Sequence, residues 1–171
     1  VEQVVLNDID SEIYEGDFTI IMGASGAGKS TLLYSLSGMD KPSLGEVEFN
    51  GKLITKMSTD ELALFRRDNC GFVFQQIYLV ESMSLLDNVL AAGLLVNKNK
   101  KEVVENAKKI LKSVDIEEHM WDKFPTQISG GEAQRVGIAR ALINNPDIII
   151  VMDEGKITNI GTHEELLNQE G

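Results

Sequence analysis

The chain has 171 residues, which is enough for one domain with a sizeable hydrophobic core. Sixteen lysine and arginine residues against 27 aspartate and glutamate residues give a formal net charge of −11, which disfavours nucleic acid as a partner because nucleic-acid binders usually present a basic surface. One cysteine, Cys70, excludes an internal disulfide and suits a reducing cytosol, and no apolar run approaches the ~20 residues of a membrane span.

The first part of the chain predicts strands followed by a glycine-rich loop. Residues 4–6, 10–13 and 18–22 are short extended or apolar stretches that indicate strands, and a turn at residues 14–17 precedes the third of them. Directly afterwards, residues 23–30 read G-x-x-x-x-G-K-S, and the residues that follow have helical character. This order of strand, loop and helix is the context in which the pattern binds phosphate.

The loop is therefore expected to be a P-loop. Its glycines allow backbone N–H groups to turn towards phosphates, and the helix N-terminus adds a partial positive charge. Lys29 would reach the β- and γ-phosphates, and the Ser30 hydroxyl would ligate Mg²⁺. The residues expected to bind the nucleotide here are Gly23, Ala24, Ser25, Gly26, Ala27, Gly28, Lys29, Ser30 and Thr31.

The next part of the chain predicts a hairpin, a helix and a buried strand. Residues 46–54 contain Asn-Gly, the strongest short hairpin pattern. A capping box opens a helix over about residues 58–68. Residues 70–74 are a candidate for a buried strand, which would deliver Gln75 and Gln76 at its end.

Three further helices and a strand complete the prediction. Residues 84–96 form a capped apolar helix, residues 97–101 a polar loop, and residues 103–114 an amphipathic helix. A capping box then opens a helix over residues 129–143. The apolar residues 148–152 predict a strand of the parallel, buried type.

Residues 128–142, Ile-Ser-Gly-Gly-Glu-Ala-Gln-Arg-Val-Gly-Ile-Ala-Arg-Ala-Leu, resemble the signature sequence of ABC-type ATPases, usually written LSGGQ. Ile128 and Glu132 are mild departures that occur in that family. As in the P-loop, a Ser-Gly-Gly cap leaves backbone N–H groups free at a helix N-terminus, where they can bind an anion. The resemblance covers almost the whole chain.

The resemblance extends to the glutamine after the second buried strand. Residues 71–75 look like the Q-loop of the family, which uses its glutamine near Mg²⁺ and the attacking water; Gln76 is the alternative to Gln75. Residues 8–17 and 65–67 resemble the branch that drives export of macrolides, lipoproteins and antimicrobial peptides. A DNA-repair ATPase of the same superfold would need a coiled-coil insertion and a basic surface, which the length and the charge disfavour.

The resemblance implies an ATP-hydrolysing motor subunit that uses ATP and Mg²⁺, with Lys29 and Gln75 catalytic. Two such domains would pack head to tail as a homodimer, so that the P-loop of one subunit holds ATP and the signature of the other closes over it. The signature residues are Ser129, Gly130, Gly131 and Glu132. The motor would be cytoplasmic, peripheral on the inner face of the cell membrane through transmembrane permease subunits. A nucleotide-binding module that does not hydrolyse ATP is the alternative.

The implied fold class is α/β, a P-loop NTPase with a mainly parallel core sheet, an antiparallel β region and a helical subdomain. Residues 1–171 would form a single ABC ATPase domain. The helical subdomain would cover about residues 77–128, and a C-terminal hairpin and helix about residues 151–171.

The family's Walker B carboxylates have one candidate pair in this sequence. Asp153 and Glu154 follow an apolar strand, and in this role Asp153 would help to hold Mg²⁺ and Glu154 would polarise the attacking water. The usual spacing from the signature serine, however, falls one residue earlier, on Met152. Residues 155–167 also look like the family's final hairpin and helix, so that Asp153 and Glu154 would belong to a late turn.

Two interpretations of this region stay open. In the first, about fifty residues are absent between roughly Ile150 and Val151, including the true Walker B pair, the D-loop and the switch histidine. In the second, Asp153 and Glu154 act as the Walker B pair. His163 lies in a capping box and is interpreted as a surface residue rather than as the switch histidine.

Overall fold

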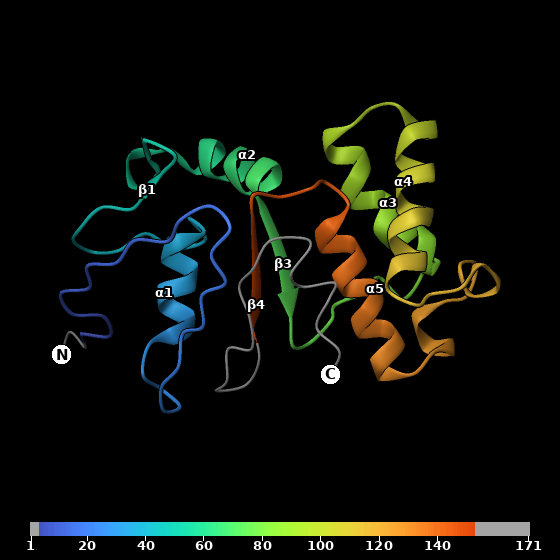
Figure 1. The fold of residues 1–171 in the computed structure, drawn as a ribbon, viewed down its shortest axis with the longest axis horizontal. Helices are drawn as coiled ribbons and strands as arrows, with labels where there is room; N and C mark the ends of the chain where they lie inside the picture. The colour runs from blue at the N-terminus through green and yellow to red at the C-terminus, as the bar shows by residue number, and fades with distance from the viewer. Residues whose placement is uncertain (1–3, 153–171) are drawn as a thin grey trace.

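The computed structural model describes residues 4–152. Its centre is a pair of parallel strands, β3 (Cys70–Phe74) and β4 (Ile148–Met152). Cys70 pairs with Ile148 and Phe74 with Met152, so the two strands are aligned along their whole length. Both strands lie at their predicted positions, and Figure 1 shows them between helix α1 (Lys29–Leu36) on one side and α5 (Gly130–Leu142) on the other.

The side chains of this strand pair alternate between two faces, as strand geometry requires. On the α1 face, Leu33 and Ile150 are buried at 1% and 2% exposure, and partly buried apolar residues of both strands pack against them. On the α5 face, Val73 and Ile149 join the largest hydrophobic cluster. Helices on both faces of a parallel pair define an α/β arrangement.

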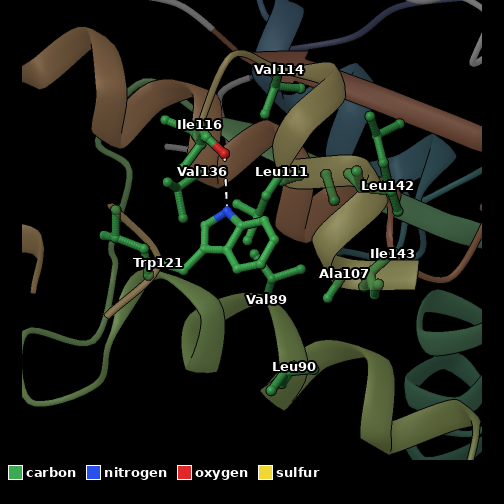
Figure 2. Packing of buried hydrophobic residues seen from close by; sticks show 14 of the residues in the cluster. Val89, Leu90, Ala107, Leu111, Val114, Ile116, Trp121, Val136, Leu142 and Ile143 are labelled. Atoms are coloured by element: carbon green, nitrogen blue, oxygen red, sulfur yellow. Dashed lines mark hydrogen bonds between the residues drawn. The ribbon is translucent and has the colours of Figure 1, made fainter. Parts of the chain in front are cut away.

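The largest cluster fills the space between α5 and two further helices, α3 (Leu85–Val96) and α4 (Lys100–Ser113). Trp121 lies at its centre, where its indole Nε1 donates a hydrogen bond to the carbonyl oxygen of Ile116 at 3.0 Å (Figure 2). The short 3₁₀ turns η2 (Glu118–Met120) and η3 (Pro125–Gln127) connect α4 to α5.

The predicted helices over 84–96 and 129–143 are confirmed, and the predicted amphipathic helix begins earlier than expected. Its apolar periodicity starts at residue 103, whereas α4 begins at Lys100 within the predicted polar loop. The first turn of α4 is polar, and Asn97 and Asn99 donate side-chain hydrogen bonds to Glu102 at 3.1 Å and 2.6 Å. Periodicity of apolar residues cannot detect a helical turn that faces water.

The predicted antiparallel region and its capped helix are confirmed. Strands β1 (Glu48–Phe49) and β2 (Lys52–Leu53) form a hairpin whose Asn50 and Gly51 have φ angles of 48° and 76°, as an Asn-Gly turn requires. The 3₁₀ turn η1 (Ile54–Lys56) leads to α2 (Thr59–Asn69). The cap of α2 is the predicted box, in which Ser58 N donates to Glu61 Oε2 at 2.7 Å.

The three strands predicted over 4–6, 10–13 and 18–22 are wrong for the described structure. No residue from 4 to 22 has strand hydrogen bonding, although the turn at 14–17 forms. Ile21 packs against Leu33 and Ile150, but Ile20 and Met22 are 49% and 84% exposed. An extended apolar segment becomes a strand only where a neighbour offers ladder partners, and within residues 4–152 the core sheet has only two strands.

Candidate nucleotide-binding site

The loop that precedes α1 has the backbone that its glycine spacing predicts. Gly26 and Gly28 have φ angles of +80° and +86°, which L side chains rarely adopt. Gly28 is also the N-cap of α1, and a Cβ atom there would lie 2.9 Å from Leu6 Cδ2 and 3.0 Å from the carbonyl oxygen of Val5. Glycine at position 28 is therefore required by both backbone conformation and space.

Lys29 is the first residue of α1, and its side chain turns back over the loop. Its Nζ atom donates to the carbonyl oxygens of Gly23 at 2.9 Å and Ala24 at 2.8 Å, and the amide of Ala27 donates to the same Ala24 oxygen at 3.1 Å. The ammonium group is thus held at the loop by neutral carbonyls. A phosphate is a stronger partner for an ammonium group than a carbonyl is, because its hydrogen bond carries charge on both sides.

The start of α1 can also receive an anion. The amide of Leu32 donates to the carbonyl oxygen of Gly28 at 2.9 Å, which is the first bond of the helix. The preceding amides therefore have no partner within the helix. The first turn contains no acidic residue, and Ser25 and Ser30 are exposed. These residues fit a phosphate chain with Mg²⁺ beside it.

The end of β3 brings Gln75 to the same edge of the strand pair as the loop. In Figure 1 the start of α1 and the ends of β3 and β4 lie together at the lower edge of the molecule. This is the carboxyl edge of a parallel sheet, where α/β proteins bind ligands. Gln75 and Gln76 are both exposed, and the Oε1 atom of Gln76 accepts a hydrogen bond from Tyr78 Oη at 2.7 Å.

The predicted capping box of the signature is present at the start of α5. Ser129 N donates to Glu132 Oε2 at 2.6 Å, and Glu132 N donates to Ser129 Oγ at 3.3 Å. The hydrogen bonds from Ser129 hold the pKa of the Glu132 carboxyl below its ordinary value. Gly130 and Gly131 are exposed beside this box, so the N-terminus of α5 is open to solvent.

The two helix N-termini with free amides, those of α1 and α5, do not meet within one chain. Figure 1 shows α1 and α5 on opposite sides of the β3–β4 pair, with the starts of both helices towards the lower edge of the molecule. The structure therefore brings Gln75 to the edge where residues 23–31 lie, and it leaves residues 129–132 apart from that loop.

Two residues that no sequence pattern marks as functional hold the segment after Gln75. Arg140 of α5 donates from Nη2 to the carbonyl oxygen of Ile77 and from Nη1 to that of Tyr78, both at 2.8 Å. Asn88 of α3 is 2% exposed, and its side chain exchanges hydrogen bonds with the backbone of Val80 at 2.8 Å and 3.1 Å. The sequence signal that could have indicated this role is that Asn88 is a polar residue in a predominantly apolar helix, because a buried polar side chain is usually hydrogen-bonded.

The candidate Walker B residues Asp153 and Glu154 lie outside the described residues. His163 also lies outside them. Strand β4 is continuous across Ile150 and Val151, which pair with successive residues of β3.

These observations define an α/β fold of the P-loop NTPase class. A family model described as ABC transporter matches residues 6–155. The chain belongs to the ABC transporter family, as one of its ATP-binding domains. Among the helices of residues 4–152, none has the length and apolar character needed to cross a membrane.

Two curated relatives agree with this assignment. The chain is 44% identical over 146 residues to the ABC transporter ATP-binding protein MJ1508 of Methanocaldococcus jannaschii, with 85% of this chain and 65% of that protein covered. It is 43% identical over 145 residues to the lipoprotein-releasing system ATP-binding protein LolD of Buchnera aphidicola subsp. Schizaphis graminum, with 85% and 63% covered. The chain thus spans less than two thirds of the length of these relatives. The similarity to LolD is consistent with the resemblance to the lipoprotein branch.

Solved structures confirm the fold class. A dimeric structure of MJ0796, described as a bacterial ABC transporter cassette, superposes with a TM-score of 0.79 at 41% identity and covers 86% of this chain and 65% of that one. A second MJ0796 structure, a dimer bound to ADP and Pi in a post-hydrolysis state, gives a TM-score of 0.75 at 38% identity, with the same shares covered.

Proposed function

We propose that this chain is the ATP-binding and ATP-hydrolysing motor subunit of an ABC transporter. The observation that carries the proposal is the loop before α1, where Lys29 Nζ lies 2.9 Å and 2.8 Å from two loop carbonyls at an open helix N-terminus. The motor would occupy a single domain over residues 1–171, with a helical subdomain over about residues 77–128 and a C-terminal hairpin and helix over about 151–171.

The ATP phosphates would be held by residues 23–31, with Lys29 next to the β- and γ-phosphates. Mg²⁺ would be held by the Ser30 hydroxyl and Gln75, and also by Asp153 where that residue belongs to the Walker B pair. Bound MgATP supplies the phosphoryl group that is transferred to water. Lys29 offsets negative charge on that group, and Gln75 orients the water.

A second copy of the chain would complete the site. The N-terminus of α5 is open to solvent, and it lies on the other side of the strand pair from α1. In a head-to-tail homodimer, Ser129, Gly130 and Gly131 of one subunit would face the γ-phosphate bound by the other, while Glu132 holds Ser129 in place. The dimeric MJ0796 structures support this proposal.

The dimer would drive transmembrane permease subunits and would be cytoplasmic, peripheral on the inner face of the cell membrane. The similarity to LolD supports an exporter of the lipoprotein branch, and the net charge of −11 argues against nucleic acid as a partner. ATP binding favours the closed dimer and hydrolysis releases it, so the nucleotide shifts a two-state equilibrium.

A second candidate function is a module that binds ATP without hydrolysing it. Which function applies depends on whether this chain contains the catalytic Walker B carboxylate. Either Asp153 and Glu154 act as the Walker B pair, or core residues are absent between roughly Ile150 and Val151. The exposed apolar residues before the P-loop and the two-stranded core sheet of residues 4–152 support the absence of core strands. In that case the chain is a nucleotide-binding module that does not hydrolyse ATP.

Measurement of Mg-dependent ATPase activity and ATP affinity of the full chain tests the proposal. Lys29→Ala should abolish turnover and strongly weaken ATP binding, whereas Lys109→Ala, which removes an exposed lysine of α4, should change neither. Turnover that depends on Lys29 would rule out the non-hydrolysing module. ATP binding that depends on Lys29 without turnover would establish that module, and binding that is indifferent to Lys29 would refute both candidates.

A further inference from the structure

Arg140 connects the signature helix to the segment that follows Gln75. Its two terminal nitrogens donate to the successive carbonyl oxygens of Ile77 and Tyr78, each at 2.8 Å. A planar guanidinium with two donors fixes both the position and the orientation of its partners. Among residues 4–152, Arg140 forms no salt bridge with a carboxylate. Its donors are directed at this segment of backbone.

The face of α5 that carries Arg140 also packs closely against Ile77. Gly137 lies one turn before Arg140, and a Cβ atom at position 137 would lie 2.9 Å from Ile77 Cγ2. Any side chain at this position would push Ile77 away from α5. The absence of a side chain at position 137 therefore lets the segment approach close enough for the Arg140 hydrogen bonds.

The far end of the segment is fixed independently. The amide of Val80 donates to Asn88 Oδ1 at 2.8 Å, and Asn88 Nδ2 donates to the Val80 carbonyl oxygen at 3.1 Å. At the near end, Phe74 is held in β3 by its pairing with Met152. Gln75 therefore lies between a strand end and the Arg140 anchor, with only Gln76 separating it from the anchor.

We propose that Arg140 is the positioning residue for Gln75 and that it ties Gln75 to the helix that begins after Ser129. The inference rests on the proposed function. In the proposed dimer, each chain contributes Gln75 to the ATP site at its own P-loop and Ser129 to the ATP site at the P-loop of the other chain. Arg140 and Ser129 are parts of one helical element, α5 with its N-cap. Displacement of the signature therefore displaces the anchor of Gln75, and Arg140 links the two ATP sites within each chain.

A nitroxide spin label on Gln76→Cys reports the order of this segment directly, without any nucleotide. The native thiol should react with the label much more slowly than the introduced one, because burial raises the pKa of Cys70 to about 12. Three variants are compared in this background. Arg140→Met removes the donors and keeps an apolar stem, and Arg140→Lys keeps the charge with a single-point donor. Arg67→Met is the matched control, since Arg67 is exposed and pairs with the adjacent Asp68.

The label should be ordered in the parent protein and in Arg67→Met, clearly more mobile in Arg140→Met, and intermediate in Arg140→Lys. Unchanged mobility in Arg140→Met would overturn the proposal. If Arg140→Met does not fold, as judged by circular dichroism, the comparison of Arg140→Lys with Arg67→Met decides in the same way. This part of the experiment stands even if the chain binds no ATP, so it separates failure of the inference from failure of the proposed function.

The unlabelled proteins test the link to the second site. In Arg140→Met the affinity for ATP should stay within about twofold, while ATP-dependent dimerisation weakens by about tenfold. In a Gln75→Ala background the same substitution should have no further effect on dimerisation, because residues that act through one another are not additive. An equal effect in both backgrounds would overturn the claim that Arg140 acts through Gln75.

Discussion

The Nζ atom of Lys29 lies 2.8 Å from the carbonyl oxygen of Ala24, so the first residue of α1 folds back over the loop that leads into it. This contact shows that the lysine is already at the loop that its sequence pattern assigns to phosphate. Substitution by methionine should therefore weaken ATP binding by about 10- to 100-fold, the range of about 1.5–3 kcal/mol for a hydrogen bond to a charged group.

Equilibrium binding of a fluorescent ATP analogue measures this loss. Stability in urea should change little, because the carbonyl partners of Lys29 are solvent-accessible and can bond to water. An affinity that is unchanged in Lys29→Met would contradict the assignment of the loop.

Gly28→Ala should destabilise the protein by about 1–3 kcal/mol through backbone strain, with a further cost from the contact with Leu6 Cδ2. The φ angle at Gly28 is +86°, and the contact distance would be 2.9 Å. Gly45→Ala is a matched control, because Gly45 has a φ angle of +90° and a Cβ atom there would have no neighbouring atom within 4 Å.

Urea denaturation of the two alanine variants separates strain from steric overlap. The excess destabilisation of Gly28→Ala over Gly45→Ala is the cost of displacing residues 5 and 6 from the loop. Equal losses in the two variants would mean that residues 5 and 6 do not pack there.

The capping box of α5 predicts a dependence of stability on pH. The hydrogen bonds from Ser129 lower the pKa of the Glu132 carboxyl below its ordinary value of 4.5. This group therefore stabilises the fold above pH 4.5, and its contribution is lost as the pH falls through the lowered pKa. Glu132→Gln should reduce stability at neutral pH and flatten the acid limb of the stability curve.

Denaturation curves between roughly pH 3 and pH 7, which include the range in which carboxyl groups titrate, measure this effect. Glu61→Gln should behave alike, since Ser58 lowers the pKa of Glu61 in the same way. Glu81→Gln removes an exposed glutamate that lies in a loop. If Glu81→Gln flattened the curve as much as Glu132→Gln, the effect would come from net charge rather than from the cap.

Cys70 should resist alkylation in the folded protein. Burial raises the pKa of its thiol to about 12, so at pH 8 only about 10⁻⁴ of it is the reactive thiolate. Iodoacetamide should modify Cys70 slowly in the native protein and rapidly in urea, which mass spectrometry follows over time. Cys70 packs against the buried residues Ile54, Leu62 and Phe65. Fast modification of the native protein would show that this packing does not shield the thiol.

The elements that the sequence predicted correctly carry local patterns. Each capping box that marks a helix start, Ser58 with Glu61 and Ser129 with Glu132, is contained in four consecutive residues. The hairpin turn is marked by two residues, Asn50 and Gly51. Because the partners are neighbours in the chain, the sequence alone contains the physical cause. The start of α1 after the glycine-rich loop belongs to the same group, whereas the strand predicted before that loop is wrong and the assignment of residues 23–31 to phosphate stays a prediction.

The wrong strands and the missed anchor of Arg140 concern partners that are distant in the chain. Residues 18–22 have the composition of a strand, but pairing depends on another segment, and the described structure offers no ladder partner to them. The hydrogen bonds of Arg140 reach carbonyls that precede it by 62 and 63 residues. A backbone carbonyl carries no side-chain identity, so no pattern in the sequence could have indicated that contact.

The composite ATP site is tested most directly by mixing two variants, each defective in one half of it. Lys29→Ala removes the P-loop contact, and Gly131→Asp places a negative charge at the start of α5, where the γ-phosphate of the partner would lie. Sedimentation velocity with Mg²⁺ and a non-hydrolysable ATP analogue should show dimers for the parent chain and monomers for each variant alone. In the mixture one site has an intact P-loop and an intact signature, so dimers should reappear. A mixture that stays monomeric, or dimers in Lys29→Ala alone, would contradict the account.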